Sequence, residues 1–309
     1  MLELKNMSIR FGKGPAAVTD VSFTVPEGQR TIVIGETGSG KSVLLLAILG
    51  LLPGSAQLDG EILFEGRNIA NLSQKQMDGV RGSQISYIPQ GSGNGLNPLY
   101  TVGRQIDETI IKHRRLSRKA ARAETEALLT RFGIENAPRL ARAHPFAYSG
   151  GMRQRALIAM GIAADARLVL ADEPTKGLDQ HRIQSVVEAF EQLNGRTLLC
   201  VTHDLRLAQR IADRVVVMYA SQQIESCEGV DFFFNPLHPY SRAMIEALPE
   251  NGLNASMGFA PPREDEQAQS ACHFYDRCPD RRGRCRQAPP MIEVGDRKVR
   301  CWKYDDGNA

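Results

Sequence analysis

The residues Gly35-Glu36-Thr37-Gly38-Ser39-Gly40-Lys41-Ser42 follow the pattern G-x-x-x-x-G-K-S. An apolar run over Arg30–Ile34 precedes them and a predicted helix over Val43–Leu52 follows, which is the strand–loop–helix context that the pattern needs. The glycines let the backbone N–H groups face a phosphate, and the helix N-terminus adds partial positive charge. Lys41 would reach the β- and γ-phosphates, and Ser42 would ligate Mg²⁺. The predicted nucleotide site includes Gly35, Thr37, Gly38, Ser39, Gly40, Lys41 and Ser42.

The composition is that of an ordinary globular protein, with 309 residues, 42% hydrophobic and 24% charged. This length allows one large α/β domain and a smaller appendage. The net charge of +3 is too small to argue for nucleic acid, and we expect no such partner. No apolar run approaches the roughly 20 residues of a membrane span, and Met1–Lys5 lacks the layout of a signal peptide. We expect a cytosolic chain that meets a membrane only through a partner.

Hydrophobic patterning predicts an α/β fold. Apolar and polar residues alternate over Leu2–Arg10 and Ala17–Val25, as in half-buried strands. Further short strands are predicted at Arg30–Ile34, Glu61–Phe64, Ile85–Ile88, Arg167–Ala171, Thr197–Val201 and Arg214–Tyr219. Helical patterns are predicted at Met152–Ala164, Gln180–Leu193 and Leu205–Ala212. This alternation predicts a parallel sheet with helices on both faces and ligands at the carboxyl ends of its strands.

Two regions depart from the alternation. Val102–Arg115 and Arg118–Phe132 are helical patterns rich in charge, which indicates a helical insertion. After Ser221 the alternation is predicted to stop. Beyond it, Leu237–Leu248 can form a short helix, and Asn251–Ser270 is a polar linker that contains glycine and proline.

A pair of acids ends the buried strand Arg167–Ala171. Asp172 would hold Mg²⁺, and Glu173 would polarise the attacking water. The alternative is a pair of solvated acids that open a turn before Pro174. The phosphate-binding pattern upstream favours the nucleotide role.

A second loop, Ser149-Gly150-Gly151-Met152, opens another predicted helix. Ser149 is well placed as an N-cap, which would be a structural role. The two glycines expose backbone N–H groups at the helix start and predict a second anion-binding site. Two helix N-termini that can bind phosphate in one chain indicate that each nucleotide is bound between two protein surfaces.

The order of these motifs resembles an ABC transporter ATP-binding subunit. It comprises the phosphate loop, Gln90, Ser-Gly-Gly-Met, Leu-Val-Leu-Ala-Asp-Glu-Pro, Gly-Leu-Asp and Val-Thr-His-Asp, and covers Met1 to about Ser226. The resemblance implies a P-loop NTPase fold with a RecA-like parallel-sheet core, an antiparallel β subdomain and a helical insertion at about 100–165. The ATPase domain would span 1–230, and 231–309 would form a C-terminal extension with a four-cysteine cluster.

The resemblance also implies roles in ATP and Mg²⁺ binding and in hydrolysis. Glu173, His203 and Gln90 would be catalytic, with His203 contacting the γ-phosphate and Gln90 sensing Mg²⁺ and water. Phe11 matches the position of the aromatic that stacks on adenine, with a core phenylalanine as the alternative. The alternative interpretation of Gln90 is that it is simply a polar loop residue after Pro89.

In that family two ATPase domains dimerise head-to-tail around two ATPs. By resemblance, Ser149, Gly150, Gly151 and Asp179 would act in trans, on the nucleotide of the partner or at the dimer interface. Tyr148 and Met152 replace a leucine and a glutamine found in many relatives, and neither change removes a catalytic group.

The C-terminal residues narrow the resemblance. Asn235–Arg242, which contains His238-Pro239-Tyr240, and Ala247-Leu248-Pro249 resemble the extension of the oligopeptide, dipeptide and nickel importer ATPases. The alternative for His238-Pro239-Tyr240 is a plain helix start.

Four of the six cysteines cluster near the C-terminus with the spacing Cys272-x5-Cys278-x6-Cys285-x15-Cys301. A segment with little apolar content invites a metal. The spacing lacks the paired C-x2-C of many zinc sites, and four thiolates also suit a [4Fe-4S] cluster. Members of the dipeptide group carry a similar pattern that ends Arg-Cys-Trp, and the resemblance implies such a cluster. Zinc and free or disulfide-linked thiols remain alternatives.

The leading expectation is an ATPase that powers an importer of dipeptides or oligopeptides, with nickel or a metal chelate as the alternative. Its expected partners are a second ATPase subunit in a heterodimer, two transmembrane permease subunits and an extracytoplasmic solute-binding protein. It would lie at the cytoplasmic face of the inner membrane. A soluble accessory or DNA-maintenance ABC ATPase is the alternative from another class.

Overall fold

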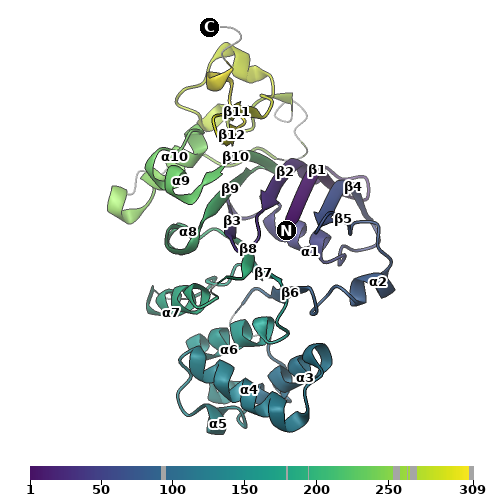
Figure 1. The fold of residues 1–309 in the computed structure, drawn as a ribbon. Helices are drawn as coiled ribbons and strands as arrows, with labels where there is room; N and C mark the ends of the chain where they lie inside the picture. Colours follow the sequence, from purple (N-terminus) through teal and green to yellow (C-terminus); the bar gives the residue numbers. More distant parts are fainter. Residues whose placement is uncertain are drawn as a thin grey trace. The chain divides into compact units, whose positions relative to one another are not determined.

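The computed structural model describes residues 1–91, 95–178, 180–193, 195–252, 258–262, 264 and 270–305. These residues form two compact units (Figure 1). The first unit contains Met1–Val25, Thr31–Ala70 and Ala212–Ala309. The second contains Pro26–Arg30 and Asn71–Ile211.

The N-terminal part of the first unit is antiparallel. Its strands are β1 (Leu2–Phe11), β2 (Ala16–Val25), β4 (Ala56–Phe64) and the short β5 (Arg67–Asn68), and β1 pairs with both β2 and β4. The alternating apolar side chains of β1 and β2 are buried, as predicted. The strand expected at Glu61–Phe64 begins earlier because the mostly exposed residues before it pair with β1 through their backbone and show no apolar alternation.

A second group of strands in this unit includes the strand that leads into the phosphate loop. The strands β3 (Arg30–Ile34) and β9 (Arg214–Tyr219) run parallel, and β10 (Gln222–Glu228) returns antiparallel to β9. The alternation was predicted to stop after Ser221, and no strand was predicted directly after it, but the structure has one there. Ala220 and Ser221 take the left-handed conformation in a tight turn, and β10 follows at once. Its sequence is polar, but most of its side chains are buried.

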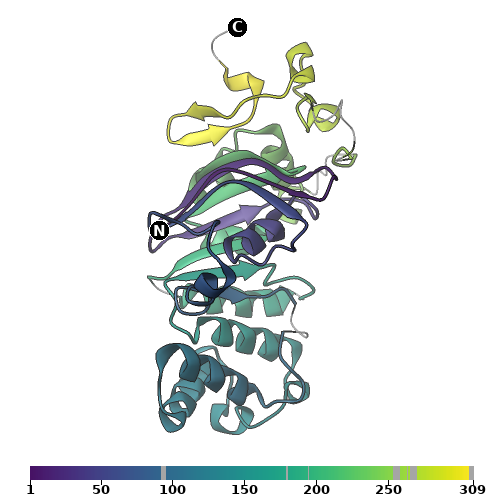
Figure 2. The ribbon, with the colours of Figure 1, turned by 90° about the vertical axis from the view of Figure 1, so that its right-hand side faces the viewer.

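The C-terminal segment packs within the same unit. It contains α9 (Gly229–Phe234), α10 (Pro239–Glu246) and a small hairpin of β11 (Ile292–Val294) and β12 (Arg297–Val299). Figure 2 shows the hairpin in yellow. The strand β12 also pairs with β10, where Val299 lies opposite Glu225. The predicted helix over Leu237–Leu248 is present as α10, whereas the hairpin was not predicted.

The second unit is built on three parallel strands. They are β6 (Ile85–Ile88), β7 (Leu168–Asp172) and β8 (Thr197–Thr202), with β7 in the middle. Every residue of β7 and β8 is buried, as expected for central parallel strands. The helices α2 (Gln74–Asp78), α7 (Gln180–Glu191) and α8 (Leu205–Ile211) belong to the same unit.

The predicted helical insertion is also present in the second unit. It consists of α3 (Val102–Arg114), α4 (Arg118–Arg131), α5 (Ala137–Leu140) and α6 (Gly150–Ile162), which lie together in Figure 1. An ion pair between Asp107 and Arg122, 2.5 Å apart, joins α3 to α4. Among the described residues, no helix combines the length and apolar character that crossing a membrane requires.

Candidate functional site

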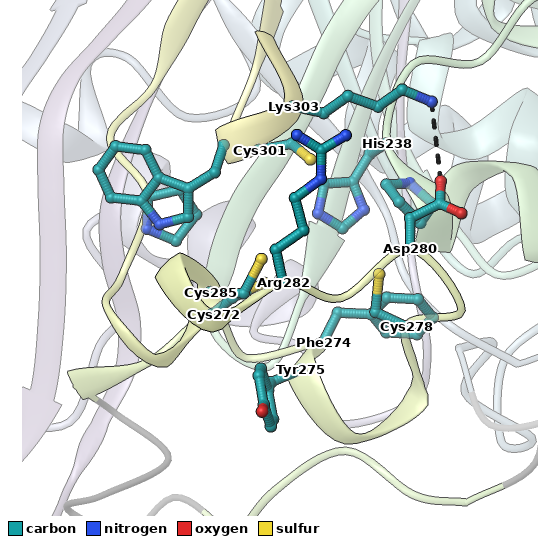
Figure 3. A pocket seen from close by; sticks show the side chains of 13 residues that line it. His238, Cys272, Phe274, Tyr275, Cys278, Asp280, Arg282, Cys285, Cys301 and Lys303 are labelled. Atoms are coloured by element: carbon teal, nitrogen blue, oxygen red, sulfur yellow. Dashed lines mark ion pairs between the residues drawn. The ribbon is translucent and has the colours of Figure 1, made fainter. Parts of the chain in front are cut away.

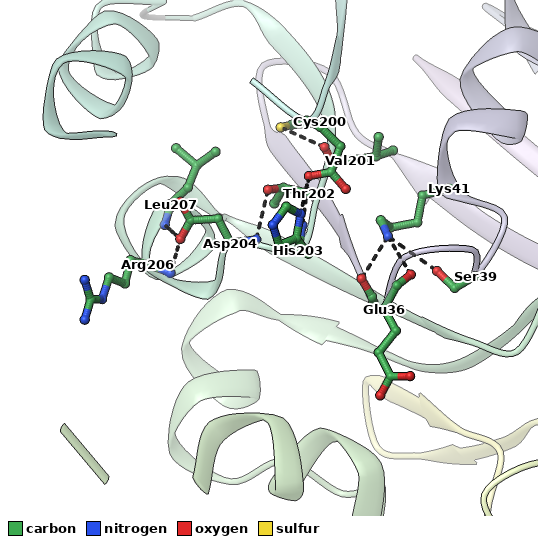
Figure 4. Close-up of polar contacts among 12 residues, drawn as sticks. Glu36, Ser39, Lys41, Cys200, Val201, Thr202, His203, Asp204, Arg206 and Leu207 are labelled. Carbon is green, nitrogen blue, oxygen red and sulfur yellow. Dashed lines mark hydrogen bonds and ion pairs between the residues drawn. The ribbon is translucent and has the colours of Figure 1, made fainter. Parts of the chain in front are cut away.

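The phosphate loop connects β3 to α1 (Lys41–Ile48) in the first unit. Helix α1 begins at Lys41, two residues earlier than predicted, so both Lys41 and Ser42 lie in its first turn. The Lys41 amino group donates to the carbonyl oxygens of Gly35, at 2.8 Å, and Glu36, at 2.9 Å (Figure 4). It also lies 3.5 Å from the Ser39 hydroxyl. The buried Lys41 ammonium is therefore hydrogen-bonded to oxygen atoms of the loop. Phosphate oxygens could accept hydrogen bonds from it in the same way.

Two glycines are required by the shape of this loop. A Cβ at Gly35 would lie 2.1 Å from the carbonyl oxygen of Met218 in β9. Gly40 has φ +100°, in the left-handed region, and a Cβ there would lie 2.4 Å from the Ala17 carbonyl oxygen. No side chain fits at either position, so the loop backbone lies directly against its neighbours. Thr37 and Gly38, between them, are exposed.

The predicted acids lie at the carboxyl end of β7, in the second unit. Asp172 is 5% exposed and accepts a hydrogen bond from the Tyr87 hydroxyl at 3.2 Å. Glu173 is 7% exposed, and its φ of +44° places a non-glycine residue in the left-handed region. The alternative of solvated acids is inconsistent with this burial. A strained, buried carboxylate is a common feature of functional sites.

Three predicted site residues follow neighbouring parallel strands of the second unit. Glu173 follows β7, His203 follows β8 and Gln90 follows β6. The His203 Nδ1 atom lies 2.5 Å from Glu173 Oε2, and the His203 backbone N–H donates to the same oxygen at 3.3 Å. Gln90 is exposed beyond the end of β6. The carboxyl ends of parallel strands are where ligands bind in such sheets.

The remaining predicted ATP-site residues have diverse environments. Ser149 is the N-cap of α6, and its hydroxyl accepts a hydrogen bond from the Met152 N–H at 3.3 Å. Gly150 and Gly151 form the first turn of that helix. Phe11 is half-buried at the end of β1 and is not part of the buried core. Asp179 lies outside the described residues.

The four C-terminal cysteines line one pocket. Cys272, Cys278, Cys285 and Cys301 share it with His238, Phe274, Trp302 and other residues (Figure 3). Burial raises the pKa of the Cys272 thiol to about 12 and also raises the pKa values of Cys278 and Cys301. All six cysteines have free thiols. Within the described ranges, no group of three or more His, Cys, Asp or Glu side chains is arranged to hold a metal ion.

Comparison with known proteins identifies the family. The ABC transporter family model matches residues 18–176, and the family model of the oligopeptide/dipeptide transporter C-terminal region matches residues 224–285. The chain belongs to the ABC transporter family. This ABC protein is 36% identical to the dipeptide transport ATP-binding protein DppD of Bacillus subtilis over 318 residues, covering 99% of this chain and 95% of DppD. It is 37% identical to the Haemophilus influenzae DppD over 314 residues, covering 97% and 94%.

Solved structures support the same assignment. The dimeric ATP-binding cassette MJ0796, described as a post-hydrolysis state bound to ADP and Pi, matches with a TM-score of 0.65 and 26% identity. The match covers 74% of this ABC protein and 98% of MJ0796. The predicted ABC ATPase fold is therefore confirmed.

Sequence reasoning missed three residues of this ABC protein that contact either Asp172 or the phosphate loop. Tyr87 donates to Asp172, and the buried position of its ring and that carboxylate raise the Tyr87 pKa. Tyr240 and Arg277 both contact Glu36 in the phosphate loop. Tyr240 lies in the His-Pro-Tyr stretch that the sequence had singled out, but no local pattern connects it to a loop 204 residues away.

Proposed function

We propose that this ABC protein is the ATP-hydrolysing subunit that powers an importer of dipeptides or oligopeptides. The Glu173–His203 contact is the observation that carries hydrolysis, because a buried carboxylate joined to a histidine can polarise and orient a water. The peptide cargo is supported by similarity over nearly the whole chain to peptide transport ATP-binding proteins. We propose peptides in preference to nickel because the relatives that match nearly the whole chain, such as the two DppD proteins, are peptide transport proteins.

The proposed roles follow the chemistry of each group. The phosphate loop would bind the triphosphate through its backbone N–H groups and Lys41. Mg²⁺, when bound, would neutralise phosphate charge, and the hydroxyl of Ser42 and the carboxylate of Asp172 are the hard oxygen donors that it prefers. Glu173 would act on the attacking water, and His203 and Gln90 would orient it. Phe11 would stack on adenine.

The assembly is part of the proposal. Ser149, Gly150, Gly151 and Asp179 would complete the site of a second ATPase subunit, in a heterodimer. Two permease subunits and an extracytoplasmic solute-binding protein would complete the importer, with this chain at the cytoplasmic face of the inner membrane. The ATPase domain would span residues 1–230, and residues 231–309 would form the C-terminal extension.

The substitution Glu173→Gln tests the hydrolytic role. It removes the group that would polarise water but leaves the phosphate loop intact, so ATP turnover should be abolished while ATP binding is retained. Phosphate release and binding of a fluorescent ATP analogue measure the two separately. Near-normal turnover in this variant would contradict the assignment of Glu173. Glu191→Gln, at a partly exposed residue of α7 that pairs with Arg210, serves as a charge-matched control.

We also propose that Cys272, Cys278, Cys285 and Cys301 bind a [4Fe-4S] cluster. The shared pocket supports this because a cubane cluster takes one thiolate on each of its four irons, around a common centre. A zinc ion would need all four sulfurs about 2.3 Å from one point. The bound cluster would cross-link a segment that has little apolar core of its own.

A further inference from the structure

Two residues of the C-terminal segment contact Glu36, the second residue of the phosphate loop. The Arg277 guanidinium donates to the Glu36 carboxylate at 2.8 Å, and the Glu36 backbone N–H donates to the Tyr240 hydroxyl at 3.2 Å. The Arg277 side chain is 10% exposed and that of Glu36 is 40% exposed. All three residues belong to the first unit. Glu36 is therefore fixed through both its side chain and its backbone.

An aromatic cluster sets the positions of these two residues. The rings of Tyr219, Tyr240 and Phe274 contact one another with centroid distances of 4.5–5.5 Å. Arg277 also donates to the Tyr219 hydroxyl at 3.2 Å and lies over the rings of Tyr219 and Phe274. Tyr219 ends β9 directly after Met218, whose carbonyl oxygen lies against Gly35. Tyr240, Arg277 and strand β9, which lies against Gly35, are thus joined through one aromatic cluster.

We propose that Tyr240 and Arg277 are positioning residues for ATP binding, acting through Glu36. The inference rests on the proposed role of residues 35–42 in phosphate binding. Arg277 neutralises a carboxylate that would otherwise repel an incoming triphosphate. Tyr240 fixes the second residue of the loop, so that the following N–H groups keep the curvature that binds phosphate.

The two contacts make different contributions. Loss of Arg277 leaves Glu36 with an unpaired negative charge beside the phosphate-binding backbone, which opposes anion binding. Loss of the Tyr240 hydroxyl removes one hydrogen bond and leaves the charge balance unchanged. The loss of ATP binding caused by removing Arg277 should be reversed by a second substitution, because Glu36→Gln removes the unpaired charge. A residue that only stabilised the fold would not be rescued in this way.

The experiment measures the affinity of the full chain for a fluorescent ATP analogue and the KM and kcat for ATP. Arg277→Gln should weaken binding by about tenfold, the value of roughly one charge-assisted contact at a partly exposed position. Adding Glu36→Gln should recover most of that loss. Tyr240→Phe, which keeps the ring cluster, should weaken binding about threefold. In each case KM should rise while kcat at saturating ATP changes less than twofold.

Arg286→Gln is the matched control, because Arg286 is an exposed arginine of the same segment and its substitution changes the net charge equally. It should leave ATP affinity unchanged. Lys41→Ala separates the two proposals: retention of normal binding there would contradict the role of the loop itself. If Lys41→Ala loses binding while Tyr240→Phe and Arg277→Gln bind within twofold of the wild type, the positioning role is wrong. If Arg277→Gln fails to fold, Tyr240→Phe alone decides, and normal affinity in it overturns the inference.

Discussion

His238 is a buried histidine whose neutral form is built into the fold. Its Nδ1 atom accepts a hydrogen bond from the Tyr240 N–H at 3.0 Å and so caps α10. Burial lowers the pKa of His238 to about 3, and the nearby Arg242 guanidinium acts in the same direction. A protonated ring would lose the acceptor and place a second cation in this buried position.

The resulting pH dependence has a defined sign. The pKa of His238 is lower in the folded state than the unfolded value near 6.5, so only the unfolded chain takes up this proton as the pH falls. The contribution of the neutral ring is complete above pH 6.5 and is lost as the pH falls towards 3. As the pH falls from 6 to 5, the loss of this contribution should reduce the free energy of unfolding by up to about 1.4 kcal/mol per pH unit. Urea denaturation across pH 5–7.5 measures this slope.

The control is His238→Asn, because an asparagine oxygen can accept the same capping hydrogen bond and does not titrate in this range. The variant should show a flatter slope than the wild type below pH 6.5. Equal slopes in the two proteins would mean that His238 is protonated in the folded state as readily as in the unfolded chain.

Individual residues also show what the sequence can predict. Lys41 and Ser42 follow from spacing alone, because the phosphate loop is a local structure with a fixed pattern. Arg277 and Tyr87 do not, because each acts through a contact with a residue far away in the sequence, and an arginine or tyrosine satisfies many environments equally well. The N-cap role of Ser149 was predicted for the same local reason as the loop.

At the level of elements, β10 shows the limit of hydrophobic patterning. Its central Glu225 is fully buried and accepts hydrogen bonds from the Leu237 and His238 N–H groups, each at 2.8 Å. Arg297 in β12 also donates to it at 2.7 Å. Hydrophobic patterning predicts that a charged residue such as Glu225 is exposed. The partners that allow its burial lie more than ten residues away, so a local pattern does not include them. Strands with apolar patterns, such as β7, have no such ambiguity.

The four-cysteine segment gives a prediction at the same scale. The protein prepared without air should contain about four irons and four sulfides per chain. It should also show broad absorbance in the blue that bleaches with dithionite. Four pocket-lining thiols in a segment with little apolar core are the physical reason.

Cys278→Ser should lose iron, whereas Cys200→Ala, which changes a cysteine inside β8, should retain it. Metal analysis of the two variants measures the difference. Stoichiometric zinc without iron in the wild-type chain would refute the cluster.

At the level of the whole molecule, the first unit joins the two ends of the chain. Arg300 donates to the Asp20 carboxylate at 2.8 Å, and Gln223 in β10 accepts from the Ser22 N–H at 2.9 Å. These partners are 280 and 201 residues apart, so no local pattern could predict them. The family resemblance predicted the fold because the motif order is specific, but it carried no information on how the C-terminal segment packs against the N-terminal strands.

Membrane association is the whole-molecule prediction that separates the proposed importer from a soluble ABC ATPase. The importer needs contact with permease subunits embedded in the bilayer, so the chain should sediment with membranes when those subunits are present. Deletion of the integral partners should move it to the supernatant. Immunoblotting of the two fractions measures the distribution.

A sodium carbonate wash provides a further check, because it strips proteins held by other proteins and leaves embedded ones behind. The chain should be released while its permease partners stay in the pellet. The Lys41→Ala variant controls for nucleotide state: assembly through protein contacts should persist when ATP binding is lost. A chain found in the supernatant even with the permease subunits present would favour the soluble class, because an accessory or DNA-maintenance ATPase has no integral partner to hold it.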